Sequence, residues 1–521
     1  MKRTRTPTFA VTLPLTVAPR DERLLAASFE AGRRLYNACL GEALRRLQRL
    51  RRTQDWQRAR ELARLAGKKP NPQRRALFKR AEHVCGFTSA SISSYGTTCK
   101  NQAHWEERLG AHETQRIAER AFSAAQQYAF GLRGRPRFKG RQRPLHSIEA
   151  KTNDAGIRYR RATGVVEWGR LILPVRPPSQ CKDRDDYLQR ALACRTKCCR
   201  VMWRMIHGKR RWFVQLLQEG MAPQRYRTVA DAVVGRDVGP STVAVTGDTA
   251  AGLFKLAPDV EQPWRQVRRI QRAMDRSRRA TNPQAFNPDG TYKHGARIAV
   301  RSARYTKLRQ RLAETERVLA ARRNRAHGAL ANAIVGLGNV IQAEQLSYKS
   351  FQSSFGRSVK VRAPGAFVQR LRLEAESAAG RFVQLPTRTL RLSQFDHCTA
   401  TYQRKTLSER WHVLGDGSGV VQRDVYSAFL ARCVQPHALA GGAVHPSQAF
   451  GDVAGAWAAA HLLLGRTGWM RSQCASVPGI LGTAPGLPAP QRIVRRRGQA
   501  PGHGRAAVTR GNPRGDAPRI L

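Results

Sequence analysis

The chain has 521 residues, enough for several domains, and its 93 Lys and Arg against 36 Asp and Glu give a formal net charge of +57. A chain this basic repels itself unless a polyanion compensates the charge, so nucleic acid is the expected partner. A basic membrane-surface protein fits less well, because it would consist of amphipathic basic helices, whereas this sequence contains many strand patterns.

The cysteine content and the N-terminus indicate an intracellular protein. The ten cysteines are scattered through a long chain, unlike the dense disulfide framework of a small secreted domain. The apolar run that follows Lys2 and Arg3 is short, is interrupted by Thr and Pro, and lacks a convincing cleavage site, so it predicts a strand and not a signal peptide. The apolar patch at residues 454–464 is too short to span a bilayer. We therefore expect a soluble cytoplasmic protein associated with the nucleoid.

The N-terminal half is predicted to contain one strand, then helices, then short strands. The predicted elements are a strand at residues 9–13, helices at 24–51, 73–82, 91–107 and 112–132, and strands at 157–159, 165–168 and 171–173. Two further strands, at residues 201–205 and 212–216, flank the turn His207-Gly208-Lys209 and predict a hairpin.

Two basic segments of this half are candidate nucleic-acid contacts. The first is a turn-forming stretch in which cations would contact phosphates and an aromatic ring would pack against a base or sugar. Its candidate residues are Arg135, Arg137, Phe138, Lys139 and Arg141. An ordinary solvated linker is the alternative for this stretch. The second segment is the hairpin turn, with Lys209 and Arg210 as the candidate residues.

The second half contains three acids in similar settings. A hairpin is predicted over residues 233–246, and Asp237 ends its first apolar run. A strand over 339–344 ends in Glu344, and a helix over 423–433 has Asp424 in its first turn. The other predicted elements are helices over 263–280, 302–337 and 367–379 and a strand over 382–385. After about Pro478 the chain is rich in Pro, Gly and Arg, which predicts a disordered basic tail.

Asp237, Glu344 and Asp424 are the candidate catalytic residues. A sheet of the RNase H type would bring them to one edge, where three carboxylates cannot all be ionised without cations between them. Two Mg²⁺ ions would resolve that repulsion, one activating water and one stabilising the leaving oxygen of a phosphodiester. Taken singly, Asp424 is explained by the helix dipole and Glu344 by surface exposure, so their order and settings carry the prediction.

The motifs around these acids resemble those of TnpB, the transposon-encoded RNA-guided endonucleases related to the type V CRISPR effectors. Gly235-Arg236-Asp237-Val238-Gly239, Ala343-Glu344-Gln345-Leu346 and Gln422-Arg423-Asp424-Val425 are similar, in order, to the three motifs of the split RuvC nuclease. Arg34-Leu35-Tyr36-Asn37 resembles an early helix of that family, and residues 134–139 resemble its basic turn. The likeness covers roughly residues 8–435.

The resemblance implies an α+β multidomain fold. Residues 1–231 would form a nucleic-acid-binding lobe, a β-barrel-like wedge with an inserted helical region. Residues 232–391 and 422–440 would form a split RuvC-like nuclease of the RNase H-like α/β type, separated by an eroded zinc ribbon at residues 392–421. Residues 441–521 would be a C-terminal extension that is basic and disordered toward its end.

The zinc ribbon of that family requires two cysteine pairs between the second and third motifs. This chain has only Cys398 there, and His397, His412 and Asp416 do not complete two tight pairs. Because zinc binding supplies most of the folding energy of such a ribbon, the loss of three thiolates predicts that no zinc is bound and that Cys398 is a lone remnant.

The resemblance implies an RNA-guided, Mg²⁺-dependent DNA endonuclease with guide RNA and target DNA as its partners. The alternative is an RNA-guided DNA-binding protein without cleavage activity, either repressor-like or a transposon remnant. The eroded ribbon favours that alternative, and the three retained acids oppose it. A basic structural nucleoid protein would explain the charge but would leave the ordered motifs to coincidence.

Overall fold

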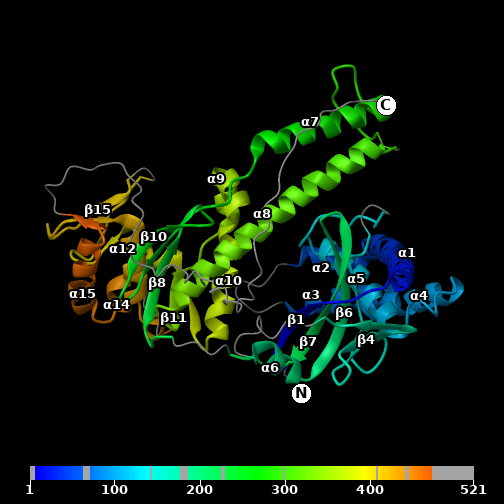
Figure 1. Cartoon of the computed structure of the whole chain (residues 1–521), viewed down its shortest axis with the longest axis horizontal. Helices are drawn as coiled ribbons and strands as arrows, with labels where there is room; N and C mark the ends of the chain where they lie inside the picture. Colours follow the sequence, from blue (N-terminus) through cyan, green and yellow to red (C-terminus); the bar gives the residue numbers. More distant parts are fainter. Residues whose placement is uncertain are drawn as a thin grey trace, which may run out of the picture.

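The computed structural model describes residues 6–62, 71–140, 144–176, 186–224, 229–296, 298, 300–406, 409–440 and 445–471. They form a mixed α/β structure with two lobes, an N-terminal lobe drawn in blue to teal and a C-terminal lobe drawn in green to orange in Figure 1. Candidate residue Arg141 and the predicted tail after Pro478 lie outside the described residues. Among the helices that are described, none combines the length and apolar character needed to cross a bilayer.

The strands of the N-terminal lobe form two antiparallel sheets. The larger sheet has the order β1-β7-β6-β2 and the smaller the order β3-β4-β5, and one bridge between Leu15 and Val175 joins them. The strands are β1 Thr8–Pro14, β2 Ser147–Glu149, β3 Arg158–Arg160, β4 Val165–Trp168, β5 Leu171–Pro174, β6 Thr196–Ile206 and β7 Lys209–Glu219. The predicted hairpin is confirmed and its strands are longer than expected, but the described strands make two linked sheets and not one closed barrel.

Helices pack against these sheets around a single apolar core. They are α1 Pro19–Leu50, α2 Gln54–Glu61, α3 Pro72–Val84, α4 Ser89–Gln102, α5 Ala111–Ala129 and α6 Tyr187–Ala193. The apolar face of α1, including Leu25, Leu35 and Leu40, is fully buried in that core. Helix α1 begins earlier than predicted because Pro19 suits a first helical position and acids in the first turn complement the helix dipole.

The C-terminal lobe is built on a five-stranded mixed sheet. Its order is β10-β9-β8-β11-β12, in which β8, β9 and β10 form an antiparallel meander and β11 runs parallel to β8 and β12. The strands are β8 Val233–Val238, β9 Thr242–Thr246, β10 Ala251–Lys255, β11 Val340–Glu344 and β12 Arg381–Leu385. The predicted 233–246 hairpin and the strands ending near residues 344 and 385 are confirmed.

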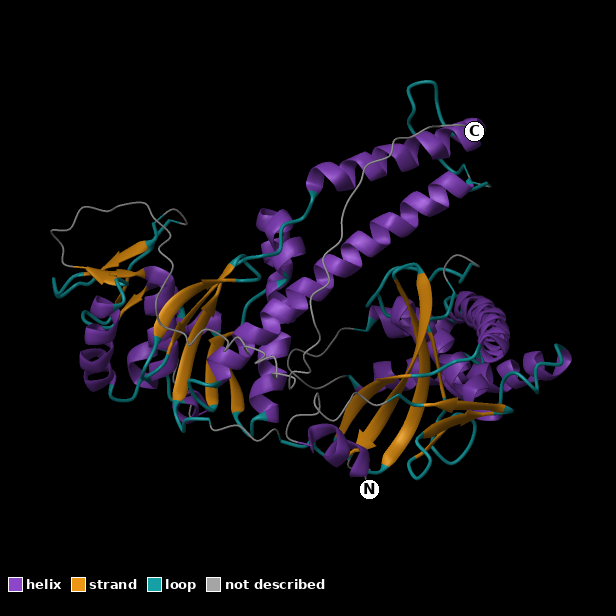
Figure 2. Cartoon of the chain, viewed as in Figure 1, coloured by secondary structure: helices purple, strands orange, loops and turns teal. Residues whose placement is uncertain are grey.

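Helices cover both faces of this sheet (Figure 2). The helices that precede residue 391 are α7 Trp264–Thr281, a 3₁₀ turn Pro283–Ala285, α8 Ala303–Val335, α9 Tyr348–Arg362, α10 Pro364–Ser377 and α11 Thr387–Leu390. The helices that follow residue 391 are a 3₁₀ turn Leu392–Gln394, α12 Arg423–Cys433, α13 Pro436–Ala440, α14 Pro446–Ala449 and α15 Val453–Arg466. Ile334 of α8 and Phe367 of α10 pack with Val234 on one face, whereas α12 packs on the other.

Helix α12 crosses β8 too closely to leave room for a side chain at residue 235. A Cβ atom at Gly235 would overlap the Ala428 carbonyl oxygen and would lie 2.5 Å from the Arg432 nitrogen. Successive strand residues point to opposite faces, so Asp237 lies on the same face of β8 as Gly235. The glycine therefore lets the middle and end of α12 approach the sheet face that carries Asp237.

The segment between the sheet and α12 contains two small hairpins. They are formed by β13 Phe395–Asp396 with β14 Thr401–Tyr402, and by β15 Trp411–Val413 with β16 Val420–Gln422. Strand β17, Met470–Arg471, pairs with β16 from the far end of the described chain. The 445–471 segment thus packs on this insert, which the sequence did not predict.

Candidate active site and nucleic-acid surface

Asp237 and Glu344 lie at the same end of two adjacent parallel strands. Ala343 of β11 pairs with Arg236 of β8, so Glu344 and Asp237 are the next residues of the two strands. Glu344 also pairs with Leu385 of β12, which places it in the middle of the sheet, and its side chain is buried. Parallel alignment therefore brings together two acids that are separated by more than a hundred residues of sequence.

Asp424 reaches the same region from the first turn of α12. The Gln422 side chain caps this helix by accepting a hydrogen bond from the Val425 N–H at 2.7 Å. Thr246 Oγ1 of β9 donates to the Val425 carbonyl oxygen at 3.2 Å. Nε and Nη2 of Arg423 both donate to Asp424 Oδ1 at 3.3 Å. The helix start and the carboxylate are thus fixed relative to the sheet.

The three carboxylates interact electrostatically through Asp237. Burial, and then the charge of Asp424, raise the pKa of Asp237 to about 7, and Arg423 opposes that shift. Burial, and then the charge of Asp237, raise the pKa of Glu344 to about 8, although the Leu392 N–H donates to its Oε1 at 3.3 Å. Crowded buried acids of this kind repel one another when all are ionised. The structure therefore brings together all three predicted residues.

A pH dependence of stability follows from these raised pKa values. A carboxyl group whose pKa is higher in the folded than in the unfolded chain loses its stabilising effect as the pH rises through the folded pKa. Between pH 6.5 and 8 in metal-free buffer, we expect the melting temperature to fall. Over this range Asp237 and Glu344 lose their protons although each is buried beside another carboxylate. Thermal unfolding of the parent chain and of Glu344→Gln measures this effect.

The Glu344→Gln variant is the matched comparison, because it keeps the shape of the side chain but cannot ionise. Its melting temperature should fall less over the same pH range. His327, whose pKa burial lowers to about 4, is present in both proteins, so its contribution to the pH dependence cancels in the comparison. Equal slopes for the parent and the variant would contradict the carboxylate coupling.

The three acids suit hard divalent cations. Among the described residues, one set of three ligand atoms lies within 4.8 Å of one another, and it belongs to Asp396, His397 and Cys398. Asp237, Glu344 and Asp424 are therefore spread more widely than the ligands of a single ion. Two ions about 3.5–4 Å apart suit such a spread, and carboxylate oxygens are the ligands that Mg²⁺ prefers. The donor set fits Mg²⁺.

Arg236 is a neighbour of Asp237 that the sequence did not single out. Its side chain is 2% exposed, and its guanidinium lies 5.1 Å from the centre of the Phe382 ring and donates to the Tyr348 hydroxyl. Burial lowers the pKa of Arg236 to about 10, and its charge lowers the pKa of Asp237. A buried arginine within a strand of the sheet is a signal that could have been read from the motif itself, because arginine is rarely fully buried.

The insert before α12 is organised around the buried carboxylate of Asp396. Its Oδ1 accepts hydrogen bonds from the N–H groups of Cys398 at 2.9 Å and Thr399 at 3.4 Å. Its Oδ2 accepts from the Gly415 N–H at 2.9 Å and lies 3.0 Å from Nε2 of His412. Asp396 and His412 are fully buried. One carboxylate thus joins the loops of both small hairpins.

These residues do not fit a ribbon zinc. Both oxygens of Asp396 already accept hydrogen bonds from the insert. Burial, and then a hydrogen bond to Asp416, raise the pKa of Cys398 to about 12, whereas zinc binds the thiolate. His397 Nδ1 lies 2.6 Å from the Tyr426 hydroxyl and so already has a partner. The contacts among these side chains occupy the atoms that a metal would need.

The insert contacts the helix that carries Asp424. The His412 ring stacks on the Tyr426 ring of α12 with centres 4.7 Å apart and an angle of 17° between the planes. Arg423 Nη1 donates to the Thr406 carbonyl oxygen at 3.0 Å. Two neighbours of Asp424 in α12 are therefore held by residues of the insert.

The predicted basic turn at residues 134–140 is packed on α1. The Lys139 N–H donates to Asn37 Oδ1 at 2.7 Å, and Asn37 Nδ2 donates to the Lys139 carbonyl oxygen at 2.9 Å. The Lys139 ammonium lies 5.7 Å from the centre of the Tyr36 ring. Arg135, Arg137 and Phe138 are exposed. The two N-terminal motif segments therefore touch, and the fold holds the backbone of the turn while presenting its arginines outward.

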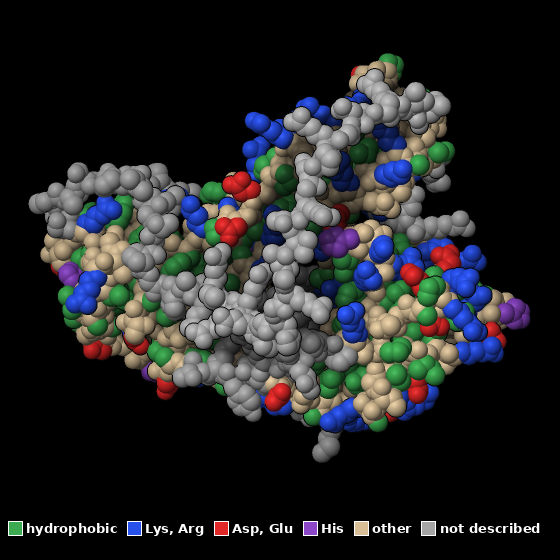
Figure 3. Space-filling model, in the orientation of Figure 1, with side chains coloured by type: hydrophobic (Ala, Val, Ile, Leu, Met, Phe, Trp, Pro, Cys, Tyr) green, Lys and Arg blue, Asp and Glu red, His purple; other side chains and the backbone are tan. Residues whose placement is uncertain are grey.

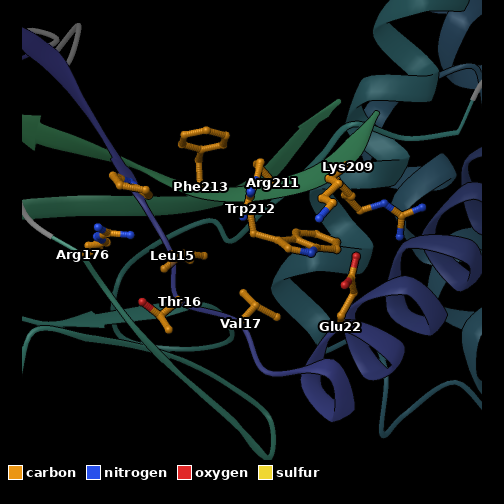
Figure 4. A pocket seen from close by; sticks show the side chains of 11 residues that line it. Leu15, Thr16, Val17, Glu22, Arg176, Lys209, Arg211, Trp212 and Phe213 are labelled. Carbon is orange, nitrogen blue, oxygen red and sulfur yellow. The ribbon is translucent and has the colours of Figure 1, made fainter. Parts of the chain in front are cut away.

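The second predicted basic segment lines a pocket of about 710 Å³ in the N-terminal lobe. Lys209 and Arg210 lie at its edge, and the Arg210 guanidinium is 4.8 Å from the centre of the Trp203 ring and 5.7 Å from that of Trp212. Figure 4 shows Lys209, Trp212 and Glu22 on one side of this pocket and Leu15, Thr16 and Arg176 on the other.

A further basic surface, which the sequence analysis did not select, lies on the projecting helical pair α7 and α8. Helix α7 buries Val267, Ile270 and Met274 and turns the rest of its surface outward. Its exposed arginines are Arg265, Arg268, Arg269, Arg272, Arg276 and Arg279. Figure 3 shows Lys and Arg side chains along this arm. The signal was present in the sequence as a narrow apolar stripe within an arginine-rich helix.

Comparison with known proteins gives weak likenesses. No protein-family model matches the chain, and no curated protein matches it. Two cryo-EM structures are similar to it, a Cas12f1-sgRNA-target DNA complex and a CRISPR-Cas12f ternary complex, each 10% identical. The first has a TM-score of 0.36 and covers 81% of this chain and 98% of its own. The second has a TM-score of 0.25 and covers 83% and 99%. TM-scores this low do not establish a shared fold.

Proposed function

We propose that this protein is an RNA-guided, Mg²⁺-dependent DNA endonuclease of transposon origin, with a split RuvC-like nuclease of the RNase H type. The observation that supports this most strongly is the meeting of Asp237 and Glu344 on adjacent parallel strands, where burial raises the pKa of both groups and the charge of Asp237 raises that of Glu344 further. Asp424, whose charge raises the pKa of Asp237 from the start of α12, completes the set.

The carboxylates of Asp237, Glu344 and Asp424 would hold the two ions. Bound Mg²⁺ supplies an activated water and charge stabilisation at the leaving oxygen in phosphodiester hydrolysis. Arg423 orients the Asp424 carboxylate through two hydrogen bonds, and the Leu392 N–H orients that of Glu344. Glu344 is buried, so its carboxylate is largely shielded from bulk solvent.

The basic surfaces would hold the guide RNA and the target DNA. Arg135, Arg137 and Phe138 on the docked turn, together with the arginines of α7, offer exposed cations and an aromatic ring. In such a system base pairing with the guide reads the sequence, while the protein contacts the backbone. The first solved structure named above contains an sgRNA and target DNA. The carboxylate geometry, and not that likeness, supports the proposal.

We also propose that the chain functions without zinc, because Cys398 is the one thiol of the insert and both oxygens of Asp396 already accept hydrogen bonds from the insert. The division into a nucleic-acid-binding lobe up to residue 231, a split nuclease, and an insert at 392–421 belongs to the same proposal, as does a cytoplasmic location at the nucleoid.

The function is tested by purifying the protein with its flanking locus and sequencing the RNA that copurifies. A DNA target matched to that RNA should be cut when Mg²⁺ is present and should remain intact in EDTA. Discrete bound RNA without cutting of any target, under any flanking motif, would favour the non-cleaving DNA-binding alternative. Absence of a discrete RNA would contradict guidance by RNA.

A further inference from the structure

The pocket in the N-terminal lobe has an uneven distribution of charge. Arg176, Lys209 and Arg211 are exposed at its rim, and none of them has an ion pair with a described residue. Arg210 adds a fourth cation, held against aromatic rings. Glu22 is the one acid of the lining. Figure 4 shows Arg176 across the pocket from Lys209, so the cations that can contact one phosphate group are Lys209 and Arg211 of β7.

The interior of the pocket is mostly apolar, with Thr16 and Glu22 as its polar side chains. Leu15 and Val17 come from the segment between β1 and α1, and Trp212 comes from β7. Trp212 is 4% exposed, and its Nε1–H has no hydrogen-bond partner among the described residues. The pocket thus offers, in Glu22, a hydrogen-bond acceptor beside an apolar wall.

We propose that this pocket binds one unstacked nucleotide of a single-stranded nucleic acid. The phosphate would lie beside Lys209 and Arg211, and the base would lie against the apolar wall. Glu22 would accept a hydrogen bond from an exocyclic amino group, so bases with such a group are favoured over thymine and uracil. A volume of about 710 Å³ is within the usual range of small-ligand pockets. This inference rests on the proposed function only in taking nucleic acid as the partner.

The test measures binding of the full chain, in EDTA, to single-stranded oligonucleotides that differ in base. Fluorescence anisotropy should give about tenfold tighter binding of oligo(dC) than of oligo(dT), and Glu22→Gln should reduce that ratio. Parallel series with oligo(rC) and oligo(rU) distinguish RNA from DNA as the source of the nucleotide. An unchanged C-to-T ratio in Glu22→Gln would overturn the inference.

The phosphate contacts are tested with Lys209→Ala combined with Arg211→Ala. The dependence of log affinity on log salt should become shallower by about 1.4, since each lost contact to a single strand removes about 0.7. Arg195→Ala is the matched control, because Arg195 lies in the same lobe and is paired with Glu219. Its salt dependence should stay close to that of the parent.

The outcomes separate this pocket from the nuclease site. Absence of the base preference together with intact Mg²⁺-dependent cutting would contradict the proposal for the pocket and would support the proposed function. A protein that shows the base preference but never cuts DNA would support the proposal for the pocket and contradict the proposed nuclease function. An unaltered salt dependence in the double variant would contradict the pocket whatever the cutting result.

Discussion

Replacing Asp237 by Asn should abolish DNA cleavage while making the metal-free protein more stable. The amide cannot replace a carboxylate as a metal ligand, and a loss of several kcal/mol of transition-state stabilisation corresponds to a rate about 10³-fold lower. The same change removes a group that burial and Asp424 make costly to ionise, so the melting temperature at pH 8 in EDTA should rise. Single-turnover cleavage assays and thermal unfolding measure the two effects.

The matched control for this variant is Asp259→Asn. Asp259 is an exposed acid of the same lobe, and it forms no ion pair with the residues that the structure describes. It should cut at the parental rate and melt at the parental temperature. Cleavage that survives Asp237→Asn would show that the nuclease site lies elsewhere, whereas lost cleavage with a lowered melting temperature would point to misfolding and not to a missing ligand.

Replacing Asp396 by Asn should destabilise the insert strongly and slow cleavage as a consequence. The amide NH₂ would face N–H donors or the His412 ring and leave part of the buried network unpaired, at a cost of about 3 kcal/mol or more. Because His412 stacks on Tyr426 of α12, movement of the insert would also displace Asp424. Differential scanning fluorimetry and cleavage rates measured at several Mg²⁺ concentrations check both consequences.

Asp416→Asn serves as the comparison for Asp396→Asn. Asp416 is exposed, and its carboxylate accepts hydrogen bonds from the Ser418 N–H at 2.9 Å and hydroxyl at 2.7 Å, so its loss should lower the melting temperature much less. Elemental analysis of the parent should find no stoichiometric zinc, and a zinc chelator should leave the melting temperature unchanged. A stoichiometric zinc ion that is lost with Asp396 would show that this carboxylate is a ligand and not the organising group of the insert.

The elements that were predicted well are those whose sequence signals are local. The hairpin over residues 233–246 has apolar runs around a Gly-Pro-Ser turn, and α12 begins and ends at the predicted residues 423 and 433. Each candidate acid also stands in the predicted setting, since strand ends and a helix start can be read from short stretches. The resemblance predicted that the three acids lie close together. The effect of Asp424 on the pKa of Asp237, and of Asp237 on that of Glu344, agrees with this prediction.

The features that were missed depend on contacts between distant segments. Strand β10 and helix α9 have weak local patterns, and their formation depends on pairing with β9 and on packing against the sheet. The network around Asp396 could not be read from the sequence, because its donors lie on two separate hairpins and its partner ring lies on α12. The sequence analysis singled out Cys398 in this stretch, whereas the neighbouring Asp396 is the residue that joins the two loops.

The close crossing of α12 over Gly235 has a consequence during protein synthesis. The two acids on the strands are made long before the helix that completes the set, and the sheet face against which α12 packs stays uncovered until residues 423–433 emerge from the ribosome. A nascent or prematurely terminated chain therefore lacks the third carboxylate and the cover over the other two. Assembly of the three-carboxylate site therefore depends on completing α12, and under the proposed function a partial translation product would lack a complete nuclease site.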